Sequence, residues 1–218
     1  MAAEHVRVEP ARAVVGHIAV PDFSMAAPFL IAASLLSGSE LTVHDVVLDP
    51  KRIRLMDVLA RMGARIAVYN RRRTGESVGD LEVRSAELVA TTLTRDDTGA
   101  LLDELPLFGL AAGCAHGDSA INGVNRLRPE EQDWIETVRT SLRALGIRAV
   151  KRKNGLGVRG VPTRPKGGGL DPRGDPRLAI MGVIAGLVSR EGAQVVDPSS
   201  VAVSFPGFFE LLESVTQR

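Results

Sequence analysis

Three stretches of the chain share one hydrophobic pattern. Each begins with a run rich in alanine and leucine, continues through a glycine, and ends in a short β-branched segment. A helix that stops at a glycine and leads into a strand produces this pattern, because the residue after a helix often adopts the left-handed conformation that glycine tolerates. The stretches are residues 27–46, 105–124 and 177–197, and their glycines are Gly38, Gly117 and Gly192.

The segments that follow the first two stretches also repeat. Residues 57–68 (DVLARMGARIAV) resemble residues 140–150 (TSLRALGIRAV), and both predict an amphipathic helix, a glycine and a strand. The short alternating segments 81–84 and 156–159 come next and predict one more strand each. One unit therefore reads helix, strand, helix, strand, strand, and it recurs after about 75–80 residues.

The third unit stops early, because the chain ends without a closing pair of strands. An exposed sheet edge would invite aggregation. We therefore expect this unit to borrow strands from the N-terminal segments VRVEP (6–10) and HIAV (17–20), or from another chain.

The composition is that of a globular protein and predicts neither nucleic-acid binding nor a membrane span. Of the 218 residues, 44% are apolar and 24% are charged, and the formal net charge is only +1. No window reaches the roughly 18 apolar residues of a membrane span, and the N-terminus has no apolar core of the signal-peptide type. One cysteine excludes an internal disulfide, and four scattered histidines do not predict a metal site. We expect a cytoplasmic enzyme or binding protein.

The apolar helices have comparable entrances, which read VPDFSMAAP, LLDELP and RGDPR. Several helix N-termini on one face would create a site for phosphate or carboxylate groups. From local geometry alone, we expect the acids at these entrances, such as Asp103 and Asp175, to be N-cap residues. Arg177 fits capping poorly, because a cation near a helix N-terminus is unfavourable, so we consider both a surface role and an anion ligand.

Residues 129–134 (PEEQDW) raise a similar choice. Pro129 can occupy the first position of a helix, and Glu130, Glu131 and Asp133 follow it within one turn. Acids in a first turn complement the positive helix end. Local geometry therefore favours a charged helix opening over a catalytic cluster.

The motifs in combination resemble a known family. LLDELPLFGLAAGCAHG, LRPEEQDW, GDPRLAIMGVIAGL and VSFPGFFELLESV occur in this order after VPDFS. Together they resemble the C-terminal half of 5-enolpyruvylshikimate-3-phosphate synthases, also called 3-phosphoshikimate 1-carboxyvinyltransferases, over about residues 14–216. The resemblance implies a mixed α/β (α+β) fold whose repeated units build an inside-out, α/β barrel-like lobe. It also implies that residues 1–90 are the last unit of a first lobe and that residues 91–218 are the bulk of a second.

The resemblance further implies a reaction and its residues. A hydroxyl of shikimate 3-phosphate attacks phosphoenolpyruvate, and the tetrahedral intermediate loses phosphate. Asp103 and Glu131 match the family's two catalytic carboxylates, and Arg177 matches an arginine that binds phosphoenolpyruvate. Ser24 and Asp175 match further substrate-binding positions. The family's reaction requires no metal or organic cofactor.

Four positions depart from the family pattern. Glu130 replaces a lysine, Trp134 an arginine, Met25 a serine and Pro176 a histidine. Loss of two cations and gain of an anion weaken a site for two polyanions. The chain is therefore expected to be either a partial or divergent transferase, completed by an N-terminal half or by a homodimer, or a non-catalytic binding protein that keeps the fold.

Overall fold

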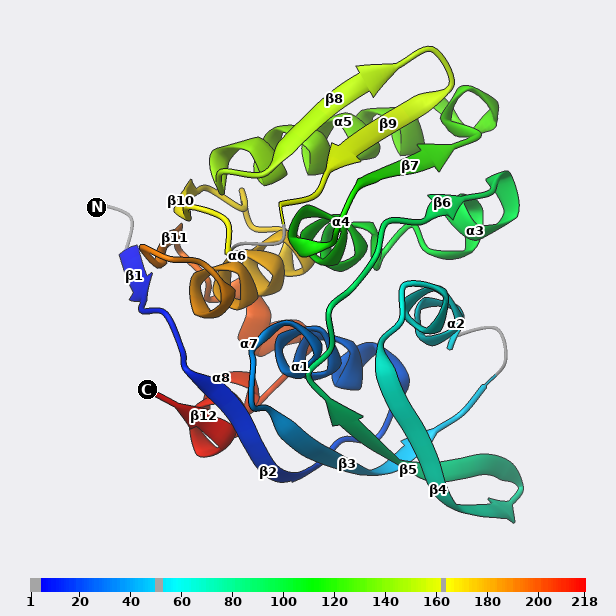
Figure 1. The fold of residues 1–218 in the computed structure, drawn as a ribbon, viewed down its shortest axis with the longest axis vertical. Helices are drawn as coiled ribbons and strands as arrows, with labels where there is room; N and C mark the ends of the chain where they lie inside the picture. Colours follow the sequence, from blue (N-terminus) through cyan, green and yellow to red (C-terminus); the bar gives the residue numbers. More distant parts are fainter. Residues whose placement is uncertain (1–4, 50–52, 162–163) are drawn as a thin grey trace.

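Three apolar helices form the centre of the computed structural model, which describes residues 5–49, 53–161 and 164–218. They are α1 (Phe23–Leu35), α4 (Leu105–Cys114) and α6 (Pro176–Val188), and each contacts the other two. Most of their residues are buried, whichever side of the helix they occupy. A helix that is apolar all round belongs inside a protein, and Figure 1 shows the three in the middle of the molecule.

The first two units have the same topology. The first contains β2 (Ala13–Ala19), α1, β3 (Glu40–Val47), α2 (Arg54–Arg61), β4 (Arg65–Thr74) and β5 (Glu76–Arg84), with its strands in the order β2-β3-β5-β4. The second contains β6 (Thr92–Leu93), α3 (Arg95–Ala100), α4, β7 (Asp118–Asn122), the 3₁₀ turn η1 (Val124–Arg126), α5 (Pro129–Ala144), β8 (Arg148–Arg152) and β9 (Gly155–Arg159), in the order β6-β7-β9-β8. In both, the first two strands are parallel and the other pairs antiparallel. The predicted repeat is confirmed.

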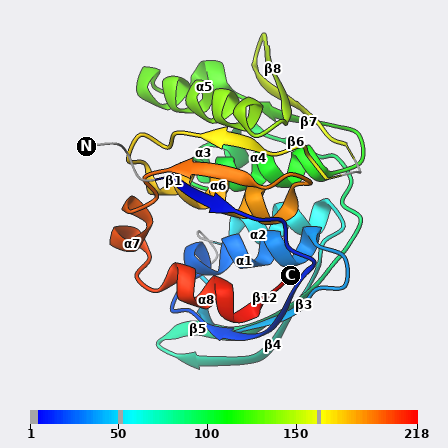
Figure 2. The ribbon, with the colours of Figure 1, turned by 90° about the vertical axis from the view of Figure 1, so that its left-hand side faces the viewer.

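The third unit is completed by the N-terminal strand. It consists of β10 (Gly168–Leu170), α6 and β11 (Ala193–Val196), followed by α7 (Ser200–Ser204), α8 (Phe208–Val215) and β12 (Thr216–Gln217). Strand β1 (His5–Val8) pairs antiparallel with β11, in the place that β5 and β9 hold in the other units (Figure 2). The expected pairing of segment 6–10 with the third unit is confirmed for residues 6–8, whereas residues 17–19 form the end of β2 in the first unit. Strand β12 extends the first sheet by pairing with β2.

One repeated hydrogen bond shows that β1 is equivalent to β5 and β9. Shortly after each of these strands, a backbone N–H donates to a carbonyl near the end of the central helix of its unit. These bonds satisfy carbonyls that the helix itself leaves without a partner. The pairs are Ala86 to Ser34 (3.0 Å), Val161 to Gly113 (3.1 Å) and Ala11 to Leu187 (2.9 Å).

The sheets surround the helical centre and do not close into one barrel within the described residues. The mixed α/β class and the inside-out arrangement agree with the sequence-based expectation. Residues on both sides of position 90 belong to one hydrophobic core, since α1 packs on both α4 and α6. The assignment of residues 1–90 and 91–218 to two lobes of the family stays a prediction.

Candidate functional site

The entrance of α6 is built around Asp175. Its carboxylate caps the helix by accepting hydrogen bonds from the backbone N–H groups of Arg177 (2.9 Å) and Leu178 (3.4 Å). Pro176 follows in the first turn, where the N–H that it lacks would have no partner in the helix. Asp175 is therefore fixed to the helix entrance by backbone hydrogen bonds, and its carboxylate in turn accepts hydrogen bonds from the Arg177 side chain.

The guanidinium of Arg177 joins two helix entrances. Its Nη1 donates to Asp103 (2.6 Å), which lies just before α4, while its Nε and Nη2 donate to Asp175 (3.1 and 2.7 Å). Burial alone would raise the pKa of Asp175, but the hydrogen bonds and charge of Arg177 outweigh it and lower that pKa. The hydrogen bond to Asp175 is the main reason why the pKa of Arg177 is raised. The structure thus brings three of the predicted site residues into direct contact.

Trp134 of α5 forms the floor of this site. The guanidinium carbon of Arg177 lies 3.7 Å from the centroid of the indole, which is a cation–π contact. The indole Nε1–H donates to the backbone carbonyl of Leu102 (2.7 Å), and the ring packs against the hydrophobic core. The sequence analysis identified Trp134 only as the replacement of a family arginine. The structure shows that its indole contacts Arg177, the arginine that the chain retains.

Glu104 is a member of the site that the sequence analysis missed. It is half-buried at the N-cap of α4, and burial, followed by the negative charge of Asp103, raises its pKa. The hydroxyl of Ser24, in the first turn of α1, and the charge of Arg177 act in the opposite direction. The available signal was the Asp-Glu pair at the helix entrance, which resembles ordinary capping.

Glu131 lies apart from these contacts. Its carboxylate accepts the backbone N–H of Arg128 (2.9 Å), which caps α5, and forms an ion pair with the guanidinium of the same residue (2.7 Å). The hydrogen bonds from Arg128 lower the pKa of Glu131. Within the described part of the chain, no hydrogen bond or ion pair joins it to Asp103 or Arg177. Here Glu131 serves the helix opening, and its catalytic role stays a prediction.

The remaining candidate positions lie in the first turns of α1 and α5. Ser24 is exposed, and Asp22 caps α1 by accepting the N–H of Met25 (3.0 Å), whose side chain packs against the core. Glu130 is exposed at the start of α5. Met25 and Glu130 therefore add no cation to the site.

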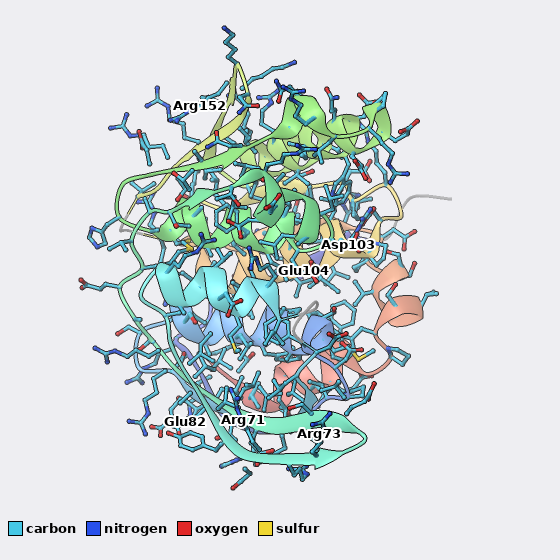
Figure 3. The ribbon with its side chains drawn as sticks, turned by 90° about the vertical axis from the view of Figure 1, so that its right-hand side faces the viewer. Arg71, Arg73, Glu82, Asp103, Glu104 and Arg152 are labelled. Atoms are coloured by element: carbon cyan, nitrogen blue, oxygen red, sulfur yellow. The ribbon has the colours of Figure 1, made fainter. Side chains whose placement is uncertain are left out.

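The site is open and acidic. The guanidinium of Arg177 contacts the carboxylates of Asp103 and Asp175, the charge of Arg177 also acts on Glu104, and the Asp103 side chain is 75% exposed. Figure 3 shows Asp103 and Glu104 together at one end of the central helices, far from Arg71 and Arg73 of the β4–β5 hairpin. A ligand carrying several negative charges would need further cations from outside this contact network.

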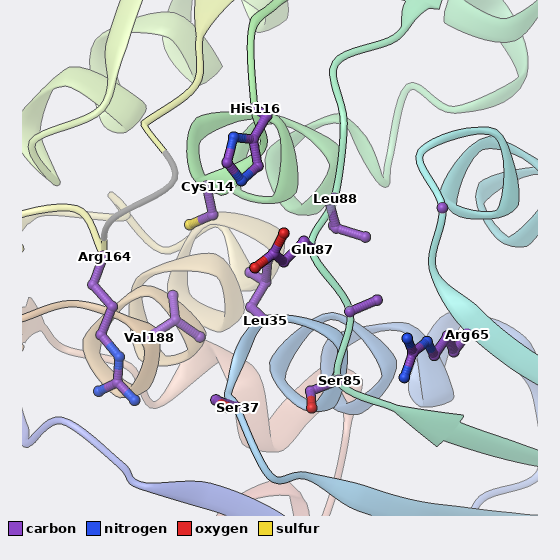
Figure 4. Close-up of a pocket in the computed structure, with 12 residues that line it drawn as sticks. Leu35, Ser37, Arg65, Ser85, Glu87, Leu88, Cys114, His116, Arg164 and Val188 are labelled. Carbon is purple, nitrogen blue, oxygen red and sulfur yellow. The ribbon is translucent and has the colours of Figure 1, made fainter.

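A separate cavity of about 590 Å³ lies at the opposite ends of the same helices. It is lined by Leu35, Cys114 and Val188, the last residues of α1, α4 and α6. Figure 4 shows Arg164 and Arg65 on opposite sides of it, with Glu87 and His116 between them. Burial raises the pKa of the Cys114 thiol to about 12, so this sulfur is protonated at neutral pH and is a poor nucleophile.

Among the residues that the structure describes, no group of three or more His, Cys, Asp or Glu side chains could hold a metal ion. None of their helices is long and apolar enough to cross a membrane.

Comparisons with known proteins agree on one family. The family model described as EPSP synthase (3-phosphoshikimate 1-carboxyvinyltransferase) matches residues 2–212. The 3-phosphoshikimate 1-carboxyvinyltransferase of Limosilactobacillus fermentum is 40% identical over 211 residues, which cover 95% of this chain and 49% of that relative. The same-named protein of Gloeobacter violaceus is 39% identical over 211 residues, with 96% and 49% covered. The chain thus spans about half the length of these relatives.

Solved structures show the same fold. EPSP synthase from Acinetobacter baumannii superposes with a TM-score of 0.82 at 28% identity, over 89% of this chain and 46% of that one. The enolpyruvyl transferase NikO from Streptomyces tendae gives a TM-score of 0.66 at 20% identity, over 87% and 42% of the two chains. The second likeness concerns the fold alone.

Proposed function

Because the chain belongs to the EPSP synthase family, we propose that it carries one half of an active site that transfers the enolpyruvyl group of phosphoenolpyruvate to shikimate 3-phosphate. The other half of the site is supplied by a complementary N-terminal half or by a second copy of this chain. A cytoplasmic location is part of the same proposal.

The contact of Arg177 with Asp103 and Asp175 supports this proposal most directly. The three residues come from the entrances of two buried helices, where backbone N–H groups and the helix dipole favour anions. Arg177 is anchored yet 38% exposed, so an oxyanion can reach it from solvent. A rigid, accessible arginine beside an exposed acid is the arrangement that binding and protonating an enolpyruvyl group require.

The proposed roles follow from the chemistry. A base removes the proton of the attacking hydroxyl group, and an acid protonates the methylene carbon of phosphoenolpyruvate as the C–O bond to its C2 forms. The intermediate then returns a proton from the methyl carbon and loses phosphate. Asp103 and Glu131 are the proposed acid and base, Arg177 binds phosphoenolpyruvate, and Ser24 and Asp175 complete the binding surface.

The open, acidic character of the site explains why the other half is needed. Both substrates are polyanions, whereas in this site two carboxylates bind the guanidinium of Arg177 and Glu104 adds a third acid at the same helix entrance. Water also reaches the exposed Asp103. Because water screens charges, it weakens the electrostatic interactions on which enolpyruvyl transfer depends. A second body must therefore contribute cations and cover the helix entrances.

Complementation tests the proposal. The chain is mixed with the N-terminal half of the Limosilactobacillus fermentum relative, phosphoenolpyruvate and shikimate 3-phosphate, and release of inorganic phosphate is measured. We expect turnover from the mixture and a loss of about 10²–10⁴-fold on Asp103→Asn, the usual contribution of general acid–base catalysis. The matched control is Asp96→Asn, an exposed acid in α3 that lies outside the site.

Absence of phosphate release from every combination, including the chain alone at high concentration, would contradict the proposal. Turnover that survives Asp103→Asn would remove Asp103 from its proposed role and leave the transfer itself intact.

A second candidate function is favoured by Trp134 and Glu130. If the lost cations abolish turnover, the chain is a binding protein that keeps the fold without the reaction. Calorimetric titration with shikimate 3-phosphate, with and without phosphoenolpyruvate, separates the two functions when Glu130→Lys/Trp134→Arg is compared with the native chain. Ligand binding by the double variant alone would favour the binding protein, and turnover by the native sequence would exclude it.

A further inference from the structure

We propose that Trp134 is the positioning residue of an anion site that accepts a single oxyanion group through Arg177. This inference rests on the proposed function in one respect, that Arg177 is the anion ligand. Beyond that, we infer that Trp134 orients Arg177 and that the site accepts a carboxylate or phosphate group.

The orientation of Arg177 is set by the groups that contact its guanidinium. The indole of Trp134 lies against one face of the guanidinium at 3.7 Å, and its own N–H is anchored to the carbonyl of Leu102. Two carboxylates bond the edges of the same guanidinium. A flat group held on one face and two edges has little freedom left, so Trp134 fixes the plane in which Arg177 presents its remaining donors.

Two N–H donors of Arg177 remain for a ligand. A guanidinium has five N–H groups, and Arg177 uses one each on Nε, Nη1 and Nη2 for Asp103 and Asp175. One N–H therefore remains on each of the two terminal nitrogens. Two donors on neighbouring nitrogens suit one carboxylate or one phosphate, which can accept both.

Trp134 offers a ligand no hydrogen-bond donor of its own. An arginine at this position would offer the ligand further N–H groups, whereas the only N–H of the indole already donates to Leu102. Trp134 therefore does not supply a second cation with which the site could distinguish a ligand carrying two anionic groups. We expect inorganic phosphate and phosphoenolpyruvate to bind the chain with affinities within about tenfold of each other.

The chain reports this binding by itself, because Trp134 is its single tryptophan. Titration of the full chain with inorganic phosphate should give a saturable change in tryptophan emission, because a bound anion changes the electric field of the Arg177 guanidinium at the indole. Phosphoenolpyruvate is the second titrant. Absence of a saturable change and of calorimetric heat up to about 10 mM of either anion overturns the proposal.

Variants separate positioning from a merely structural role, with calorimetry as the readout where tryptophan is absent. Trp134→Phe keeps an aromatic face and should bind phosphate within about threefold of the native chain, while Trp134→Leu should bind about tenfold more weakly. Trp134→Arg should raise the preference for phosphoenolpyruvate over phosphate by at least about tenfold. Arg177→Gln should abolish binding, and Arg71→Gln, an exposed arginine of the β4–β5 hairpin, should leave it unchanged.

Thermal unfolding followed by circular dichroism verifies that each variant is folded. A folded Trp134→Leu variant with native phosphate affinity overturns the proposal, as does binding that survives Arg177→Gln. Phosphate binding that depends on Trp134 without turnover in the complementation assay would refute the transfer function and leave this inference standing. Turnover in the complementation assay, combined with a phosphate affinity that does not change when Trp134 is substituted, would refute this inference and leave the transfer function standing.

Discussion

Two charged clusters of the chain differ in how much solvent reaches them. Arg177 and Asp103 form their ion pair at the surface, where the contact is available to a ligand. Asp97 is instead buried, with its side chain 2% exposed, and it accepts hydrogen bonds from Arg54 and Arg61 of α2 at 2.9 Å each. The first cluster suits binding, whereas the second joins α2 of the first unit to α3 of the second.

Asp97 gives a pH-dependent contribution to stability. Burial raises the pKa of its carboxyl group, but the hydrogen bonds from Thr94 and Arg61 outweigh it and lower the pKa from 3.8 to about 2. The charged form is therefore favoured in the folded chain, and this stability is present above about pH 4 and is lost as the pH falls towards 2. Because both arginines are about 40% exposed, screening reduces the contribution to roughly 1–2 kcal/mol.

We expect Asp97→Asn to lower the free energy of unfolding by roughly 1–2 kcal/mol at pH 7 and the difference from the native chain to shrink between pH 4 and pH 2. Urea unfolding over that pH range measures both effects. The neighbouring exposed Asp96→Asn is the control and should change little. A pH-independent difference would show that the ion pairs are not its cause.

At the scale of elements, the closing strand β1 depends on two glycines. A Cβ atom on Gly186 of α6 would lie 2.6 Å from the Cβ of Val8, and one on Gly192 would lie 2.5 Å from the Val8 carbonyl oxygen. Real Cβ atoms do not approach other atoms so closely. Absence of side chains at these positions therefore lets β1 lie against the third unit and complete its sheet.

Gly186→Ala tests this packing. Alanine favours a helix more than glycine does, so a substitution in α6 without a clash would stabilise the chain. We expect it instead to destabilise the chain by about 1–3 kcal/mol, the usual cost of overpacking, because β1 must shift. Gly99→Ala in α3, where a Cβ meets nothing within 4 Å, is the matched control and should be neutral or slightly stabilising in thermal unfolding.

Equal effects of the two alanine substitutions would contradict this account of β1. Hydrogen exchange at residues 5–8 gives a second measurement, since a displaced β1 should lose protection in the Gly186→Ala variant alone.

At the scale of the whole molecule, the two ends of the chain tie the units together. Strand β1 precedes the first unit but completes the sheet of the third, and β12 follows the third unit but extends the sheet of the first. The central helices α1, α4 and α6 pack against one another within this closure. The three units should therefore unfold together.

A fragment of residues 91–218 tests this cooperation. It keeps α4 and α6 but lacks α1 and β1, so it would expose the apolar faces that α1 covers. We expect the whole chain to unfold in one cooperative transition and the fragment to show none, as measured by calorimetry and near-ultraviolet circular dichroism. A cooperatively folded fragment would instead support an independent unit beginning near residue 91.

Local patterns predicted much of the fold and part of the site. The apolar runs around α1, α4 and α6, each followed by a glycine and a strand, predicted the repeat, because burial and helix ending are encoded by nearby residues. The motifs around Asp103 and Arg177 also indicated the family. They could not indicate that Glu104 is half-buried beside them, since an acid at a helix entrance has the same local signature whether or not it is exposed.

The sequence by itself therefore determined the repeat, the three central helices and the family, all of which depend on periodicity and motif order. Only the tertiary structure decided that β1, and not the 17–20 segment, closes the third unit, that Glu131 pairs with Arg128, and that Trp134 lies under Arg177. Each of these three features depends on which segments or side chains contact each other. The pattern of hydrophobic and polar residues specifies which side chains are buried, but which distant segments meet depends on how all three units pack at once.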